Sequence, residues 1–262
     1  MDNESLEIMT YECQVGMYFS GIEKLSNGFV VYSKIVEDEQ WNFFAGFSAE
    51  TIEDFENAYN DAKLFFKKIK REPCFLISPK VKISKTVEDY LNKKYDNFSI
   101  DVTMLTEEFK FINEIQEQYS FRRIDNKLEK DLFVQTFKNS KTQVVDGDTY
   151  GALPEFYFKA LDESFKSKSS WKYIHFLSTF NDFPVGMVSA VVKGEYCGLY
   201  GGGTYVLHRG KGVFRNLLKF IEKELKMKGV KYFFGITEKD SKNEKLYNYL
   251  GLESRFIKKY YK

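Results

Sequence analysis

The alternation of apolar and polar residues is clearest in the C-terminal half of the chain. Apolar residues at helical spacing predict helices at 125–140, 153–165, 213–228 and 241–251. Apolar runs between turn-forming residues predict strands at 119–124, 171–179, 185–192, 196–206, 230–237 and 253–261. Asp125 or Asn126 is expected to cap the first helix, and Gly229 is expected to end the third. This half therefore predicts a mixed α/β structure.

The N-terminal half shows a fainter version of the same order. We expect a hairpin from 28–36 and 41–47, a long helix at 48–70 capped by Ser48 or Thr51, a strand at 73–79, a short helix at 85–95 and a strand at 97–105. Strand, long helix, strand, short helix, strand is also the order of 196–262. This agreement favours a degenerate repeat, with an unrelated α/β lid as the alternative.

The fold class expected from these patterns is α/β (α+β), with a mixed sheet flanked by helices. The chain has 262 residues, enough for one large domain or two small ones. We expect two domains, at 1–116 and 117–262, with the segment 106–118 connecting the halves.

Composition excludes several classes of protein. Lys and Arg number 39 against 38 Asp and Glu, so the net charge of +1 argues against nucleic-acid binding through a basic surface. Cys13, Cys74 and Cys197 have no metal-ligand spacing, so neither a metal site nor a disulfide framework is expected. The N-terminus is polar, and no apolar run is long enough to cross a bilayer. A cytoplasmic protein is expected.

Glycine and positive charge gather at the junction between strand 196–206 and helix 213–228. The sequence "RGKG" comprises Arg209, Gly210, Lys211 and Gly212. Amide groups at a helix N-terminus have no intrahelical partner, and glycines let a ligand approach the backbone closely. With two cationic side chains, this turn predicts a pocket for a diphosphate. The alternative is a solvated basic turn that only caps the helix. Neither the P-loop motif nor the Rossmann motif is present in this turn.

The stretch "TYVLHRGKGVFRNLL" resembles the acetyl-CoA-binding motif, R-x-x-G-x-G/A, of the GNAT N-acetyltransferase superfamily. Arg209 and Gly212 match, whereas Phe214 stands where Gly or Ala is usual. The later "KLYNYLGLES" resembles the second signature of that superfamily, L-Y-x-x-x-G-F, with Leu252 in place of Phe. The resemblance covers about 117–262. It implies a GNAT-like sheet in this half and a degenerate GNAT-like N-terminal half, hence two tandem halves.

The resemblance also implies a site. The strand around Gly201–Val206 is expected to separate from strand 230–237, and the pantetheine arm of acetyl-CoA is expected in that opening. Tyr247 would be the catalytic acid that protonates the leaving thiolate, although it could instead be a core aromatic. The residues expected to bind the cofactor are Thr204, Tyr205, Val206, Arg209, Gly210, Lys211, Gly212, Val213, Phe214 and Asn243.

Several points stay open within this resemblance. The glycines Gly201–Gly203 could open the slot or could mark a simple strand irregularity. Three conceivable bases are Glu155, His175 and Glu195, and His175 could equally be a core histidine. No motif marks any of them.

The function implied is transfer of an acyl group, most often acetyl, from acyl-CoA to a primary amine of a small molecule or peptide. A non-catalytic CoA-binding sensor or scaffold is the alternative. A Fem-type aminoacyltransferase, which uses paired GNAT-like halves, is disfavoured by the intact turn and the near-neutral charge. Expected partners are acetyl-CoA, an amine acceptor and a second copy in a homodimer, without nucleic acid, membrane or metal.

Overall fold

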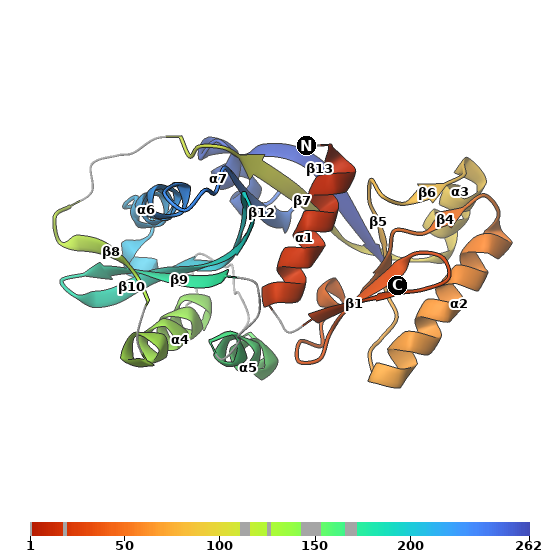
Figure 1. Cartoon of the computed structure of the whole chain (residues 1–262), viewed down its shortest axis with the longest axis horizontal. Coiled ribbons are helices and arrows are strands. Elements are labelled where there is room, and N and C mark those ends of the chain that lie inside the picture. The colour runs from red at the N-terminus through yellow and green to blue at the C-terminus, as the bar shows by residue number, and fades with distance from the viewer. Residues whose placement is uncertain (1, 18–19, 111–115, 125–126, 143–152, 166–171) are drawn as a thin grey trace. The chain divides into compact units, whose positions relative to one another are not determined.

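The computed structural model describes residues 2–17, 20–110, 116–124, 127–142, 153–165 and 172–262 (Figure 1). It forms two compact units, and neither is continuous in sequence. The first comprises Met1–Met104, Ile236–Lys245 and Ser254–Lys262; the second comprises Leu105–Gly235 and Leu246–Glu253. The domain boundaries expected from the sequence, 1–116 and 117–262, stay a prediction. The expected caps Asp125 and Asn126, and the expected first strand residue Trp171, lie outside the described residues.

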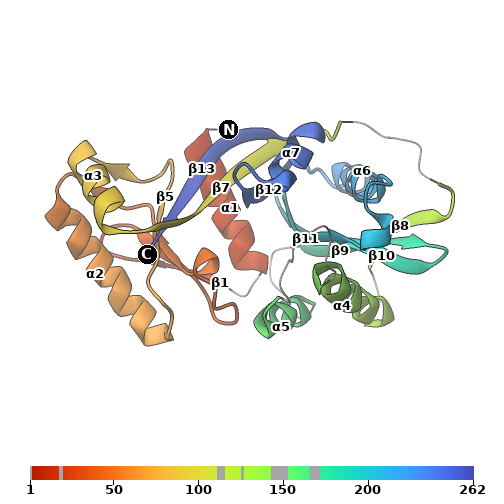
Figure 2. The ribbon, with the colours of Figure 1, turned by 180° about the vertical axis from the view of Figure 1, so that it is seen from behind.

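The second unit is a sheet with helices on both faces. Its strands are β8 (Tyr119–Arg123), β9 (Lys172–Phe180), β10 (Phe183–Lys193), β11 (Tyr196–Thr204) and β12 (Tyr232–Glu238), in the order β12-β11-β10-β9-β8. Pairing is antiparallel from β8 to β11 and parallel between β11 and β12. Helices α4 (Lys127–Thr142) and α5 (Glu155–Ser164) cover one face, and α6 (Val213–Lys226) covers the other (Figures 1 and 2).

Apolar residues at helical spacing explain why these helices bind the sheet. Phe133 and Phe137 of α4 and Phe158 of α5 pack with Leu177 and Met187 of the sheet. The buried residues of α6 recur every three or four positions and include Val213, Leu217, Leu218, Ile221 and Leu225. Strand β11 ends at Thr204, so the expectation that it continues to residue 206 is wrong. A 3₁₀ turn, Val206–His208, follows it because the chain turns there toward α6.

The first unit contains a further set of hydrogen-bonded strands and its own core. Its strands are β1 (Ser20–Lys24), β2 (Phe29–Ser33), β3 (Phe43–Ala45), β5 (Phe75–Ile77), β7 (Asn97–Thr106) and β13 (Glu253–Tyr261), in the order β1-β2-β3-β5-β13-β7. A 3₁₀ turn (Glu39–Trp41) precedes β3, and β4 (Ser48–Ala49) pairs with β6 (Lys82–Ile83) in a separate two-stranded sheet. Helices α2 (Ile52–Ile69), α3 (Lys85–Lys94) and α7 (Lys242–Tyr249) complete the order.

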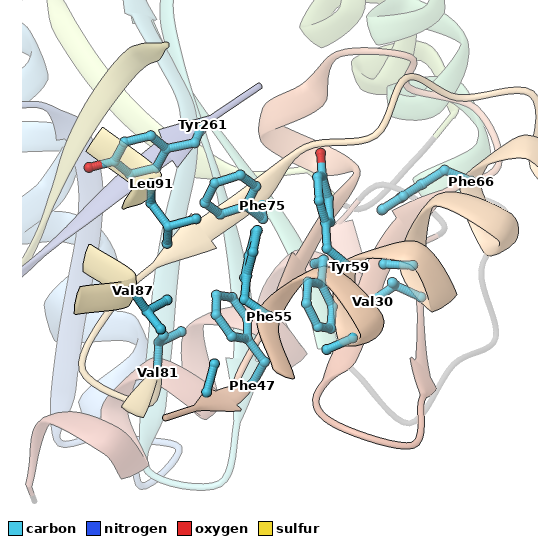
Figure 3. Packing of buried hydrophobic residues seen from close by; sticks show 14 residues of the cluster. Val30, Phe47, Phe55, Tyr59, Phe66, Phe75, Val81, Val87, Leu91 and Tyr261 are labelled. Carbon is cyan, nitrogen blue, oxygen red and sulfur yellow. The ribbon is translucent and has the colours of Figure 1, made fainter. Parts of the chain in front are cut away.

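Aromatic side chains fill the core between α2, α3 and this sheet (Figure 3). Phe55 and Tyr59 of α2 contact Phe75 of β5, with ring centroids 5.1 and 5.0 Å apart. Phe75 in turn stacks on Tyr261 of β13 at 5.2 Å. The high aromatic content of the chain thus serves core packing here, as its even spread along the sequence suggests.

Helix α1 (Asn3–Met17) was not expected from the hydrophobic pattern. Its buried positions follow helical spacing, but Glu7, Thr10 and Gln14 among them are polar. Hydrogen bonds compensate for the burial of Glu7 and Thr10. The Glu7 carboxylate accepts from the Tyr11 and Ser78 hydroxyls and from the Lys80 amide. A pattern of apolar residues alone therefore does not reveal this helix.

Candidate functional site

Strands β11 and β12 of the second unit pair over only a short length. Their parallel register joins Tyr196 to Tyr232, Cys197 to Phe233 and Gly198 to Phe234, and it stops there. β11 nevertheless continues to Thr204. Beyond Gly198 the edge of β11 that faces β12 is therefore outside this ladder, which agrees with the strand separation expected from the sequence.

A β-bulge interrupts β11 directly after this point. In the pairing with β10, Ser189 is opposite Tyr200 and Met187 is opposite Gly203, so two residues, Gly201 and Gly202, oppose Val188 alone. Gly201 has φ +60°, a conformation that other residues adopt at a cost. Bulges bend a strand and free a position from the ladder.

The three consecutive glycines also allow close packing from both faces of the sheet. A Cβ atom on Gly202 would lie 2.7 Å from the ring of Phe214, which belongs to α6. A Cβ on Gly201 would lie 3.1 Å from the ring of Phe137, and one on Gly203 would lie 2.4 Å from the Ser140 hydroxyl; both neighbours belong to α4. A side chain at any of the three positions would therefore have to displace a side chain of α4 or α6.

The turn that follows β11 presents a bare helix N-terminus. Gly210 and Gly212 have φ +73° and +80°, and Gly212 is the N-cap of α6, without a side chain that caps it. The first intrahelical bond runs from the Asn216 amide to the Gly212 carbonyl at 3.0 Å. The amides of the three residues 213–215 therefore precede the helical hydrogen-bond ladder, and the helix dipole adds partial positive charge there.

Arg209 binds backbone carbonyls of the chain, contacts that the sequence did not predict. Its Nε donates to the Thr204 carbonyl at 2.9 Å, and its Nη2 donates to the Ser140 carbonyl at 3.2 Å. The guanidinium thus ties the end of β11 to α4. Lys211 is exposed. Of the two expected cationic side chains, Arg209 thus binds backbone carbonyls and Lys211 is exposed, and their role toward a ligand stays a prediction.

Arg215 supplies a charge near the helix N-terminus that the sequence reading missed. Its Nη1 donates to the Tyr249 hydroxyl of α7 at 3.1 Å. Its Nη2 lies 3.9 Å from where a Cβ on Gly212 would be. No ion pair with a carboxylate is found for it among the described residues. The sequence contained a signal for Arg215. A cation in the first turn of a helix interacts unfavourably with the helix dipole, so its presence there suggests a role in binding.

The other expected cofactor residues lie along the same segment. The Tyr205 amide donates to the Val185 carbonyl at 2.8 Å, and its hydroxyl accepts from Asn139 at 3.1 Å. The Val206 carbonyl accepts from the Arg209 amide inside the 3₁₀ turn. Val213 is buried. The carbonyls of Thr204 and Val206 are thus both used by Arg209.

Tyr247 lies in α7 at the point where the β11–β12 ladder stops. Its ring is 3.1 Å from where a Cβ on Gly235 would be, and Gly235 directly follows the last paired residue of β12. The side chain is half-buried. Asn243 is exposed, one helical turn earlier, on the part of α7 that belongs to the first unit. The Ser241 hydroxyl accepts from the Glu244 amide, so Ser241 caps this helix.

His175 is enclosed by apolar groups. Its side chain is buried, its Nδ1 is 2.9 Å from the Ser189 hydroxyl, and its ring lies 4.2 Å from Phe165 and 4.8 Å from Phe133. Burial lowers the pKa of His175 from 6.5 to about 3. This environment matches the core histidine that the sequence left open. Of the other two conceivable bases, Glu195 forms an exposed ion pair with Lys231 at 2.6 Å, and Glu155 begins α5.

Acid is expected to destabilise the chain through His175. Because its folded pKa lies below the unfolded value, the unfolded chain binds a proton between pH 6.5 and pH 3 that the folded chain does not. Stability therefore falls as pH falls through this range, by about 4 kcal/mol at its lower end. Urea unfolding of wild type and His175→Gln at a series of pH values should show a shallower decline in the variant. Parallel curves would contradict this, and His208→Gln serves as the comparison for the other histidine.

The corresponding strand-to-helix junction in the first unit is closed. The Lys82 amide donates to the Phe47 carbonyl, and β4 pairs with β6 directly before α2. Thr51 and Asp54 form a capping box that satisfies the first amides of α2. The first turn is acidic as well, with Glu53 and Asp54. This junction is therefore unsuited to an anion, in contrast to the start of α6.

The described residues contain no group of three or more His, Cys, Asp or Glu side chains placed to hold a metal ion. They also contain no helix with both the length and the apolar character needed to span a membrane.

Comparison with known proteins identifies the fold. No family model matches the sequence, and no curated protein matches it either. Solved structures do match. A GCN5-related N-acetyltransferase from Kribbella flavida has a TM-score of 0.65 at 11% identity, with 97% of this chain and 93% of that chain covered.

Two further structures are similar over most of the chain. A functionally unknown conserved protein from Staphylococcus epidermidis has a TM-score of 0.65 at 7% identity, covering 93% of this chain and 94% of that one. A tandem GNAT protein from the clavulanic acid biosynthesis pathway has a TM-score of 0.58 at 10% identity, covering 90% and 78%. The chain therefore has the fold of the GCN5-related N-acetyltransferase (GNAT) superfamily, a mixed sheet flanked by helices that tandem GNAT proteins share.

Proposed function

We propose that this protein is an acyl-CoA-dependent N-acyltransferase that uses acetyl-CoA and a primary amine of a small molecule or peptide. One observation carries the proposal. The N-terminus of α6 has no side-chain cap, and it follows a strand that has already left its parallel neighbour. A helix start without a side-chain cap fits a diphosphate, and a strand edge outside the parallel ladder fits an amide-containing arm. Homodimer formation and a cytoplasmic location stay predictions.

The residues present fit coenzyme A at this turn. The amides of Val213 and Phe214 and the guanidinium of Arg215 are the groups that would hold the diphosphate, and Gly210 and Gly212 would allow its close approach. Acyl-CoA supplies an activated thioester when bound. A contact between Asn243 and the cofactor stays a prediction from the resemblance.

Two groups of the chain are proposed to act on the thioester. A backbone N–H of β11 beyond Gly198 is the proposed donor to the oxyanion that forms when an amine attacks the thioester carbonyl. Tyr247, beside Gly235, is the proposed acid that protonates the departing thiolate. The amine must lose a proton before it attacks, and burial and a low pKa make His175 unsuited to accept it.

Replacing Tyr247 by phenylalanine should lower turnover about 100-fold, because the variant has no hydroxyl to protonate the thiolate. The affinity for acetyl-CoA should stay within about twofold, since the ring against Gly235 is retained. Rates of thiol release and calorimetric affinities measure the two effects. Tyr196→Phe, which alters a tyrosine stacked on Tyr232 at the far end of β11, is the control. A wild-type rate in Tyr247→Phe would remove the acid role.

A non-catalytic CoA sensor is the second candidate, and the ring of Phe214 on Gly202 favours it because Gly or Ala is usual at that position in the superfamily. Calorimetry with acetyl-CoA, followed by a thiol-release assay with a panel of amines, separates the two. Binding with turnover supports the transferase, and binding without turnover for any amine supports the sensor. Absence of binding would contradict both.

A further inference from the structure

The ring of Phe214 lies on the bulge of β11. A Cβ built on Gly202 would be 2.7 Å from Cε2 and 3.2 Å from Cζ of that ring, and 3.5 Å from a methyl group of Val188. The ring is half-buried, and no described aromatic ring stacks with it. The ring of Phe214 thus covers the backbone at Gly202. A side chain at position 202 would push the ring away from it.

Phe214 connects two parts of the candidate site. Its amide belongs to the uncapped first turn of α6, and its side chain extends from that turn to the bulge. A ligand whose anionic end rests on the first turn, and whose chain continues toward the bulge of β11, has to pass this ring. The ring offers apolar surface and no hydrogen-bonding group.

We propose that Phe214 is a specificity-determining residue for the acyl donor, which its ring recognises at the branched apolar segment next to the diphosphate. This inference rests on the proposed function. In coenzyme A the diphosphate is followed by a methylene group and then by a carbon that carries two methyl groups. That segment is the apolar part of the arm nearest the anion, so it meets the ring when the diphosphate lies on the amides of residues 213–215.

The test compares two ligands by calorimetry. Coenzyme A has the branched segment, whereas adenosine 3′-phosphate 5′-diphosphate has the diphosphate and lacks the arm. Phe214→Ala is expected to weaken coenzyme A binding about tenfold, because apolar contact is lost, and to leave the affinity for the nucleotide unchanged. Phe214→Leu, which keeps an apolar side chain, should recover most of the affinity.

Gly202→Ala tests the same contact from the other side. Its methyl group displaces the ring, so coenzyme A binding should fall as it does in Phe214→Ala. The double variant Gly202→Ala/Phe214→Ala should lose no more than either single variant, since both remove one contact. Circular dichroism confirms that each variant is folded, and Gly194→Ala, at a turn with open space around it, is a glycine control.

The outcomes separate this inference from the function on which it rests. If wild type binds coenzyme A and Phe214→Ala binds it equally or more tightly, the recognition role is overturned and the transferase proposal stands. Equal weakening of both ligands would also overturn it, because the ring would then serve only the turn. If wild type binds neither ligand, the donor site itself is contradicted, and this inference with it.

Discussion

Gly212→Glu is expected to lower the affinity for coenzyme A by about 100-fold or more. The new carboxylate would stand at the N-cap of α6, which has no side-chain cap and no acidic residue in its first turn. It would occupy this position itself and repel a diphosphate, and like charges placed together at a binding surface cost several kcal/mol. Calorimetry with coenzyme A measures the effect, and unchanged affinity would remove the diphosphate assignment.

The matched control for this variant lies at the other end of the same helix. Gly229 also has a positive φ, +89°, and a Cβ there would meet nothing within 4 Å. Gly229→Glu therefore introduces the same charge and a similar backbone strain, of about 1–2 kcal/mol. It should destabilise the chain without changing coenzyme A affinity. Gly212→Ala then separates the effect of backbone strain on affinity from the effect of the added charge. A methyl group has room there, because the nearest atom, the side-chain Nδ2 of Asn216, lies 3.4 Å from the Cβ position.

Glu7→Ala is expected to destabilise the first unit by about 3–5 kcal/mol. The carboxylate is fully buried and accepts three hydrogen bonds, so its removal leaves the Tyr11 and Ser78 hydroxyls without this acceptor. The substitution also removes a negative charge that stabilises the charged form of Lys258. The buried ammonium of Lys258 donates to the Thr10 hydroxyl at 2.9 Å and lies 4.5 Å from the Tyr11 ring. Burial already lowers the pKa of Lys258 to about 8, against the opposing effects of Glu7 and Asp101.

Urea unfolding measures this loss, with Glu4→Ala as the control. Glu4 lies on the same helix, but its ion pair with Lys82 is exposed, so its removal should cost at most about 1 kcal/mol. Adding Lys258→Met to Glu7→Ala should restore part of the lost stability, because the unpaired buried charge is then gone. Equal effects of Glu4→Ala and Glu7→Ala would show that the buried carboxylate contributes no more than a surface charge.

Local signals in the sequence were sufficient wherever one residue decides the local geometry. Thr51 caps α2 as one of two expected candidates. The bulge at Gly201–Gly202 was one of the outcomes expected from the glycine run. In each case a side chain, or its absence, acts within a few residues along the chain.

Predictions failed where distant segments decide the outcome. Helix α1 was not predicted, because its buried polar residues Glu7 and Thr10 bind partners more than 70 residues away in sequence. The bond from Arg209 to the Ser140 carbonyl of α4 was not foreseen, and binding of a ligand by Arg209 stays a prediction. The reason for glycine at 203 is likewise Ser140. Spacing in the sequence cannot show such contacts, because they depend on which helix covers which face of the sheet.

The strand order has a consequence for synthesis of the chain. β13 lies between β5 and β7, and its residues Lys259, Tyr260 and Tyr261 pair with Ile77, Leu76 and Phe75. A ribosome makes residues 105–235 before it makes β13. The first unit therefore lacks the strand between β5 and β7 until the second unit has been synthesised. Contacts between residues so far apart in sequence also form slowly. During that interval the edges of β5 and β7 are open to wrong partners, which makes a nascent chain at this stage a natural client for chaperones.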